Sequence, residues 1–335
     1  MFSMESIQQT FNGSVGFGNR VTSTVSRNGD LLHKLWVVAT LSVTNAGGTT
    51  TAATTLSNVG HTLLKSVELE IGGQRIDKHY ADWLQIWSEL TMPAEKQAAY
   101  DALVGASLVG PATATTETST LYVPLQFWFC RNVGLALPLI ALQYHEVKVN
   151  IEFAGASEFA VVDAVAGDVT VAALSAELWA DYIYLDVDER KRFAQVSHEY
   201  LIDQLQFVGS DAVSGTTANS KLNFNHPVKE LVWLTKDGGA RISEDAAMVS
   251  LKLNGHDRFN TRPGTYFSMV QPFQHHTKVP ASGSGLYVYS FALKPEEHQP
   301  SGTCNFSRID NASLILSGLT GNTDELKVFA TNYNI

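Results

Sequence analysis

Short stretches in which apolar and polar residues alternate recur along almost the whole chain, and this period of two is its most constraining feature. Neighbouring side chains of an extended strand point to opposite faces, so such stretches predict strands that are buried on one face. Leu35, Val37 and Leu41 share one face, for example, whereas Trp36 and Ser42 lie on the other. The predicted strands cover residues 35–44, 67–71, 121–129, 147–153, 179–185, 201–207, 228–235, 248–254, 286–293, 312–318 and 326–331.

Few parts of the sequence show the spacing of a helix. Tyr80, Trp83 and Trp87 do, and they predict a short helix over residues 78–91 at the edge of a sandwich. Segments rich in Thr, Ser, Ala and Gly predict exposed loops. These loops cover residues 44–56, 105–120 and 209–220. Many strands separated by loops predict an all-β sandwich or barrel rather than alternating strands and helices.

The chain also repeats itself. The stretch VELEIGGQRI, which begins at Val67, matches VSLKLNGHDRF, which begins at Val249: each reads as a strand, a tight turn, an arginine and an apolar residue. A Leu-Tyr-Val strand follows each stretch, at Leu121 and at Leu286, so the two copies keep the same order. These matches predict that one β-domain has been duplicated.

The chain length agrees with two domains. Its 335 residues exceed what one sandwich needs and suit two domains of roughly 150 residues each. The densest charge cluster, residues 186–192, contains Arg190-Lys191-Arg192 between acidic residues. It is typical of a solvated connector rather than of a nuclear-targeting or phosphate-binding patch. We therefore predict an N-terminal domain of residues 1–190 and a C-terminal domain of residues 191–335.

Composition excludes several classes of protein. Hydrophobic residues make up 44% of the chain and charged residues 17%, which predicts a globular protein with full cores. No apolar run has the length of a membrane span, and MFSMESIQQT lacks the features of a signal peptide. Cys130 and Cys304 are too few and too far apart for a disulfide framework, which favours a reducing compartment. The net charge of −10 argues against direct contact with nucleic acid.

Patterns that carry catalysis or metal binding are weak. Gly283-Ser284-Gly285 lacks the spacing of a nucleophile elbow and predicts a hairpin loop. His275-His276 is the only adjacent histidine pair, and neighbouring side chains on a strand cannot easily share one metal, so we predict a loop or surface role. Glu296-Glu297 is a carboxylate pair of the kind that any acidic surface supplies. We predict no catalytic, cofactor-binding or metal-binding residues and no enzyme activity.

Long blocks of the sequence resemble the major capsid proteins of large nucleocytoplasmic DNA viruses, of the iridovirus and phycodnavirus type. Together the blocks span most of the chain and occur in the family order. They are SVELEIGGQRIDKHYADWLQIWSELT from Ser66, LYVPLQFWFCRNVGLALPLIALQYHEVKV from Leu121, DYIYLDVDERKRFAQVSHEYLIDQLQ from Asp181, FNHPVKELVW from Phe224, and the region from Leu253 to Asn311 with LNGHDRFNTRPGTYF, VQPFQHH and ALKPEEHQPSGTCNFSRIDN.

This resemblance implies an all-β double jelly-roll, that is, two tandem jelly-roll sandwiches with short helices in their loops. It implies a structural protein whose homotrimers form pseudo-hexagonal capsomers that tile an icosahedral shell, usually around an internal membrane. The implied partners are further copies of the chain, neighbouring capsomers and minor capsid or penton proteins, with the membrane contacted at most indirectly. The implied location is the virion, with assembly in the host cytoplasm.

Within this resemblance we assign structural roles to several residues. Gly72-Gly73 and Asn254-Gly255 are expected to be tight-turn residues at positive φ. Arg75 and Arg258 are expected to anchor the segments that follow these turns through hydrogen bonds. A further set, in the QPSGTCNFSRID block, is expected to fix a turn and a buried ion pair or carbonyl contact near the centre of the trimer. This set consists of Pro300, Gly302 and Arg308.

Two other interpretations stay open at this point. Jelly-rolls also serve lectins and hydrolases, so a carbohydrate-binding or glycan-processing β-sandwich is one alternative. A minor capsid or spike protein is the other. Family members also usually carry an N-terminal arm before the segment that here starts at Phe2, and a C-terminal tail after the segment that here stops at Ile335. Such arms often contact neighbouring subunits.

Overall fold

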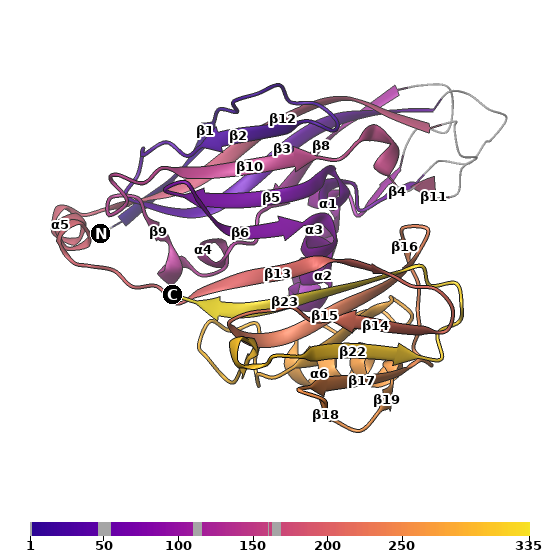
Figure 1. Cartoon of the computed structure of the whole chain (residues 1–335). Helices are drawn as coiled ribbons and strands as arrows, with labels where there is room; N and C mark the ends of the chain where they lie inside the picture. The colour runs from indigo at the N-terminus through magenta and orange to yellow at the C-terminus, as the bar shows by residue number, and fades with distance from the viewer. Residues whose placement is uncertain (1, 46–54, 110–115, 160, 163–168) are drawn as a thin grey trace. The chain divides into compact units, whose positions relative to one another are not determined.

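The alternating stretches form antiparallel strands in both halves of the chain, as the computed structural model in Figure 1 shows. The structure describes residues 2–45, 55–109, 116–159, 161–162 and 169–335. The chain divides into two compact units, which overlap in sequence order. Unit 1 consists of Met1–Gln85 and Glu95–Tyr200, and unit 2 consists of Ile86–Ala94 and Leu201–Ile335.

Unit 1 contains two main sheets within its described residues. The first has, in spatial order, β1 (Phe2–Gln9), β12 (Val169–Leu185), β3 (Leu31–Asn45) and β8 (Thr116–Pro124). The second has β2 (Arg20–Thr24), β10 (Val147–Phe153), β5 (Leu64–Ile71) and β6 (Gln74–Tyr80). The short strand β9 (Leu137–Pro138) also pairs with β3, and a small sheet joins β11 (Val161–Val162), β4 (Thr55–Ser57) and β7 (Ser107–Val109).

Unit 2 has the same two layers. Its first sheet orders β13 (Ile202–Ala212), β23 (Glu325–Asn334), β15 (Pro227–Asp237) and β20 (Leu286–Ser290). Its second orders β14 (Thr217–Lys221), β22 (Ala312–Ser317), β17 (Met248–Leu253) and β18 (His256–Asp257). Short strands extend β15 and β17; they are β16 (Ala240–Arg241), β21 (Cys304–Asn305) and β19 (Arg262–Pro263).

The main strands of the two units have the same order and connectivity. If the eight main strands of each unit are numbered in chain order, one sheet reads 1-8-3-6 and the other 2-7-4-5 in both units. This is the strand order of an eight-stranded jelly-roll built from two Greek keys. The repeated stretches at Val67 and Val249 form strand 4 of each unit, and the Leu-Tyr-Val stretches form strand 6. The two β-domains predicted from the repeat are therefore present, and they share one strand order.

The inward faces of the sheets form the core of each unit. In unit 1, the predicted face of β3 is buried, with Leu35, Val37 and Leu41 almost fully inaccessible. In unit 2, Trp233 of β15 lies 5.8 Å from the Tyr287 ring and 5.2 Å from the Phe267 ring, measured between centroids. Burying such large side chains between the sheets supplies most of the favourable free energy of folding.

The helices lie in the connections between strands. They are α1 (Val59–Leu63), α2 (Ala81–Thr91), α3 (Ala94–Val104), α4 (Trp128–Arg131), α5 (Val187–Gln195) and α6 (Gln271–His275), with a π-helical turn at Tyr266–Val270 and 3-10 turns at Val133–Leu135, Ala156–Glu158 and Phe306–Arg308. In the described part of the chain, none of these helices has the length and apolarity that crossing a membrane requires. Both Cys130 and Cys304 are free thiols.

Two predicted elements each contain a stretch of another type than expected. The predicted helix 78–91 begins at Ala81, because residues 78–80 continue β6 and pair with β5. The predicted strand 121–129 ends at Pro124, and Trp128–Arg131 forms α4 instead. Beyond Pro124 the alternation breaks down, since Phe127, Trp128 and Phe129 are all buried and their rings pack against one another.

The connecting segments hold more regular structure than expected. The charged connector at 186–192 lies mostly in α5, whose first N–H, from Val187, is bound by the Asp186 carboxylate at 2.7 Å. The predicted loop 209–220 contains the end of β13 and the start of β14. Large parts of the predicted loops 44–56 and 105–120 lie outside the described residues. The domain ranges 1–190 and 191–335 stay a prediction; the compact units differ from them by Ile86–Ala94 and by residues 191–200.

Candidate functional site

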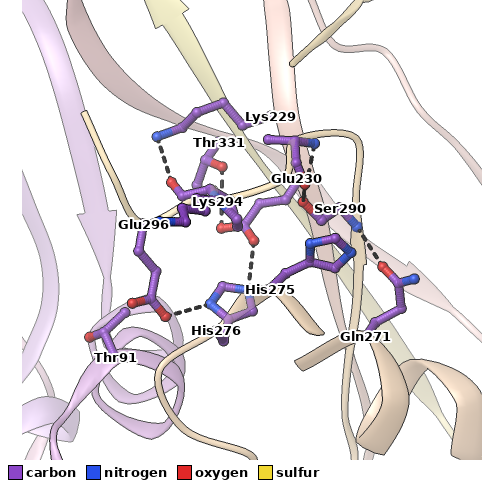
Figure 2. Close-up of polar contacts among 12 residues, drawn as sticks. Thr91, Lys229, Glu230, Gln271, His275, His276, Ser290, Lys294, Glu296 and Thr331 are labelled. Atoms are coloured by element: carbon purple, nitrogen blue, oxygen red, sulfur yellow. Dashed lines mark hydrogen bonds and ion pairs between the residues drawn. The ribbon is translucent and has the colours of Figure 1, made fainter. Parts of the chain in front are cut away.

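Unit 2 contains a group of charged side chains, most of them buried, around the end of the helical part of the connection between β18 and β20 (Figure 2). Strand β15 supplies Lys229 and Glu230, and β13 supplies Asp203. His276 directly follows α6, and Glu296 lies in the loop after β20. We call these five residues the ionic cluster.

His276 lies at the centre of the ionic cluster, and none of its side chain is exposed. Its Nε2 lies 2.8 Å from Glu230 Oε2, and its Nδ1 lies 2.8 Å from Glu296 Oε1. A carboxylate only accepts hydrogen bonds, so both ring nitrogens must donate and the imidazole is a cation. Two carboxylates from distant parts of the chain thus enclose one buried positive charge.

The pKa values agree with this geometry. Burial acts to lower the pKa of His276, but the charges and hydrogen bonds of Glu230 and Glu296 outweigh burial and raise that pKa to about 9. For Glu230, burial acts to raise the pKa, but His276 and Lys229 hold it below its ordinary value. The pair is therefore ionised at neutral pH.

Strand β15 is buried on both faces, with residues 228–236 all buried, so its neighbouring charged residues Lys229 and Glu230 are both buried. The pairing of β15 with β23 shifts between Val228 and Glu230, so Lys229 falls out of the regular alternation. Its ammonium lies 3.1 Å from Asp203 Oδ2 and donates to the Pro295 carbonyl oxygen at 2.9 Å. Lys229 and Glu230 thus bind to consecutive residues of the same loop, the first to Pro295 directly and the second to Glu296 through His276.

The ionic cluster fastens two connections onto the sheet of unit 2. Glu296 accepts a second hydrogen bond from the Thr277 N–H at 2.8 Å and a third from the Thr277 hydroxyl. His275, the residue before His276, donates from Nδ1 to the Leu293 carbonyl oxygen at 3.0 Å. Because the His276 imidazole is inaccessible and both its nitrogens are occupied, it cannot exchange protons with a substrate. The role of the cluster is structural.

The predicted turn residues adopt positive φ in both hairpins. Gly72 and Gly73 have φ of 60° and 83°, and Asn254 and Gly255 have φ of 52° and 82°. Asn254 also reaches another predicted block, since its Oδ1 accepts from the backbone N–H groups of residues 310 and 311 at 3.0 and 3.2 Å. Two positive-φ residues in succession define a type I′ turn, which suits the twist of a hairpin.

The two arginines that follow the turns have different surroundings. Arg258 is exposed; its charge acts to lower the pKa of Tyr289, which burial raises, and its backbone N–H donates to the Leu251 carbonyl at 2.8 Å. Arg75 is exposed and its charge helps to lower the pKa of Glu68, although burial acts in the other direction. Their equivalent roles as anchors stay a prediction.

The third predicted set lies in the loop and turn after β20. Pro300 and Arg308 are exposed. Gly302 has φ of 132°, and a Cβ atom there would lie 2.9 Å from the Phe291 carbonyl oxygen, so the backbone approach requires glycine. The structure does not bring these residues to the ionic cluster, and their contact near a trimer centre stays a prediction.

Sequence reasoning missed the ionic cluster. His276 lies in the loop that follows α6, as predicted, but its ring is buried and not at the surface. The pair Glu296-Glu297 is split, with Glu296 on His276 and Glu297 on the exposed Lys294. The usable signal was Lys229-Glu230 inside the apolar strand PVKELVWL, because charges there need buried partners. The described residues contain no group of three His, Cys, Asp or Glu side chains arranged for a metal.

Comparisons with known proteins cover the whole chain. A family model described as "Major capsid protein N-terminus" matches residues 1–186, and one described as "Large eukaryotic DNA virus major capsid protein" matches residues 189–335. The major capsid protein of Pyramimonas orientalis virus is 53% identical, over 100% of this chain and 87% of that protein. The major capsid protein of Paramecium bursaria Chlorella virus 1 is 41% identical, over 100% and 89%.

Solved structures show the same fold. A quasi-atomic structure of the PBCV-1 virus capsid is 38% identical and superposes with a TM-score of 0.84, covering 100% of this chain and 94% of the other. The Faustovirus major capsid protein superposes with a TM-score of 0.83 over 100% and 90% at 12% identity, which concerns the fold alone. With the identical wiring of units 1 and 2, these matches confirm an all-β double jelly-roll with short helices.

Proposed function

Because this chain belongs to the major capsid proteins of large eukaryotic DNA viruses, we propose that three copies of it assemble into one pseudo-hexagonal capsomer. The protein is a structural component of the virion and not an enzyme. The observation that carries the proposal is that the two jelly-roll units have the same strand order. A closed three-fold oligomer of a chain with two equivalent units has six equivalent lobes, which suit a hexagonal lattice site.

The proposed partners follow from this role. Capsomers of this shape contact one another to tile an icosahedral shell, with minor capsid or penton proteins at the remaining contacts. The net charge of −10 supports a shell that does not bind the genome directly, because contact with phosphates needs basic surface. The two free cysteines support assembly in the reducing host cytoplasm.

We further propose that the residues singled out in the sequence act by shaping this building block. Gly72, Gly73, Asn254 and Gly255 close equivalent hairpins of the two units, and their φ values support this role. Arg258 holds the segment after its hairpin to β17 through the hydrogen bond of its backbone N–H to the Leu251 carbonyl. Such turn and anchor contacts keep the strand register that both lobes of the capsomer require.

The oligomeric state tests the proposed trimer. The purified chain, measured by size-exclusion chromatography with light scattering, should have the mass of three 36.5 kDa chains, about 110 kDa. A mass that stays at 36.5 kDa up to high protein concentration would contradict a self-assembling trimer. The test needs no virus, no other capsid component and no change to the sequence.

A further inference from the structure

Equivalent connections of the two jelly-roll units carry helices. In both units the connection between the fifth and sixth strands is helical. In unit 1 it runs from β6 to β8 and contains α2 and α3, and in unit 2 it runs from β18 to β20 and contains the π-helical turn and α6. Since the two units have the same strand order, these connections are counterparts.

The first connection contributes a segment to unit 2. Residues Ile86–Ala94 lie between two strands of the N-terminal jelly-roll in sequence, yet they are part of unit 2. Glu89 accepts two hydrogen bonds from the Arg241 guanidinium, one of them at 3.0 Å, and the Leu90 carbonyl accepts from the Lys278 N–H at 2.9 Å. The apolar residues at positions i, i+1 and i+4 of this segment are buried. These residues are Ile86, Trp87 and Leu90.

The second connection repeats the apolar spacing without the burial. Met269, Val270 and Phe273 also occupy positions i, i+1 and i+4, but their exposed fractions are 40%, 39% and 79%. Leu293 is 72% exposed, and its carbonyl is bound by His275 at the end of the same helix. We call Met269, Val270, Phe273 and Leu293 the apolar face. Met269, Val270 and Phe273 lie within five residues of one helical stretch, and exposed apolar side chains close together on a surface mark an interaction site.

This apolar face is held rigidly. Gln271, at the start of α6, accepts a hydrogen bond from the Ser290 N–H of β20 at 3.0 Å, and this contact is buried. At the other end of α6, the buried ion pair of His276 with Glu230 fastens the helix to β15. A surface whose helix is fixed at both ends loses little conformational entropy when a partner binds.

We infer that the apolar face binds the N-terminal jelly-roll unit of a second copy of this chain. The inference rests on the proposed trimer and names its contact surface. Each chain has two counterpart connections; the first is accommodated within its own chain, and the second leaves its apolar residues uncovered. In a closed ring of three chains, each apolar face can meet the next chain, so that all six helical connections are covered alike.

The test compares two charge substitutions at exposed apolar positions of unit 2. Phe273→Asp places a charge on the apolar face, and Val208→Asp places one on an exposed residue of β13. Both positions are exposed in the single chain, so each variant should keep the far-UV circular dichroism of the wild type. By light scattering, Phe273→Asp should lose two thirds of the wild-type mass and Val208→Asp should keep it.

A photo-crosslinker supplies the second measurement. With p-benzoylphenylalanine in place of Phe273, illumination should produce a product of two chains, about 73 kDa, and mass spectrometry should place the link in residues 1–85 or 95–200 of the other copy. Links to unit 2 of the other copy, or a trimer that survives Phe273→Asp, would overturn the inference and leave the trimer standing. A monomeric wild-type chain would instead refute the trimer, and the inference with it.

Discussion

At the scale of single residues, His276 shows how a buried charge can be part of a jelly-roll core. Its ring sits between the carboxylates of Glu230 and Glu296, and its pKa is raised to about 9 from an ordinary value of 6.5. A residue whose pKa is raised on folding stabilises the folded state at low pH and stops doing so when it is deprotonated. His276 therefore sets an upper pH limit on the stability of the ionic cluster, whereas Glu230, whose pKa is lowered, loses its contribution as the pH falls.

We predict an alkaline loss of stability that depends on His276. Its contribution is fully present below pH 6.5 and is lost as the pH rises through about 9, which corresponds to roughly 3 kcal/mol. Urea unfolding at pH 7 and pH 10 should show this loss in the wild type. Because other groups titrate in this range, His276→Gln is the reference, and its loss should be smaller by that amount. Equal losses of stability in the wild type and in His276→Gln would contradict the assignment of the alkaline loss to His276.

Removing one carboxylate from the ionic cluster should be costly. Glu230→Gln leaves a buried imidazolium with Glu296 as its remaining charged partner, and breaking a buried pair in this way costs about 3 to 5 kcal/mol. Urea unfolding at pH 7 measures the change in the free energy of unfolding. The matched control is Glu297→Gln, which removes an exposed pair with Lys294 and should change stability by about 0.5 kcal/mol or less. Similar effects of both changes would argue against the structural role of the cluster.

At the scale of elements, the hairpin turns and the strand pattern carry the fold. The two turns occupy the same place in each unit, after strand 4, and each has two successive residues at positive φ. Their backbone geometry keeps β5 in register with β6 and β17 in register with β18. A shift of one residue would move every side chain of the strand to the other face of the sheet.

We predict that the second turn does not tolerate a β-branched residue. Gly255 has φ of 82° with open space around its Cα, so a substitution there tests backbone strain rather than a steric clash. Gly255→Val should lower the free energy of unfolding by about 2 kcal/mol or more, whereas Gly255→Asn should cost much less, because asparagine adopts positive φ more readily. Thermal unfolding compares the two variants. If Gly255→Val unfolds at the same temperature as the wild type, a side chain at this position does not strain the backbone of the turn.

At the scale of the whole molecule, duplication explains the architecture. One eight-stranded unit, repeated with the same wiring, yields a chain with two lobes and two helical connections. The proposed capsomer and the proposed role of the apolar face both rest on this equivalence. A contact surface of one unit has a counterpart at the same place in the other unit of the chain. The light-scattering measurement tests the proposed trimer, and the crosslinking measurement tests what the apolar face contacts.

Much of the fold could be predicted from the sequence because the relevant signals are local. Alternation in β3 placed Leu35, Val37 and Leu41 inside, and the Gly72-Gly73 pair marked a hairpin. The predictions missed where local signals conflict: the strand predicted over 121–129 ends at Pro124, after which successive aromatic residues are all buried. Helix α3 was also missed, since Tyr100 and Val104 are its buried residues and they leave little periodic pattern.

The sequence by itself determined the strands, the two tight turns, the duplication and the family, since each depends on residues close together in the chain or on long matching blocks. Only the tertiary structure decided which charges are buried together and which unit Ile86–Ala94 belongs to. His276, Glu230 and Glu296 come from separate segments, and no local pattern records that they meet. Their ionisation depends on distances and burial, which exist once the sheets have packed.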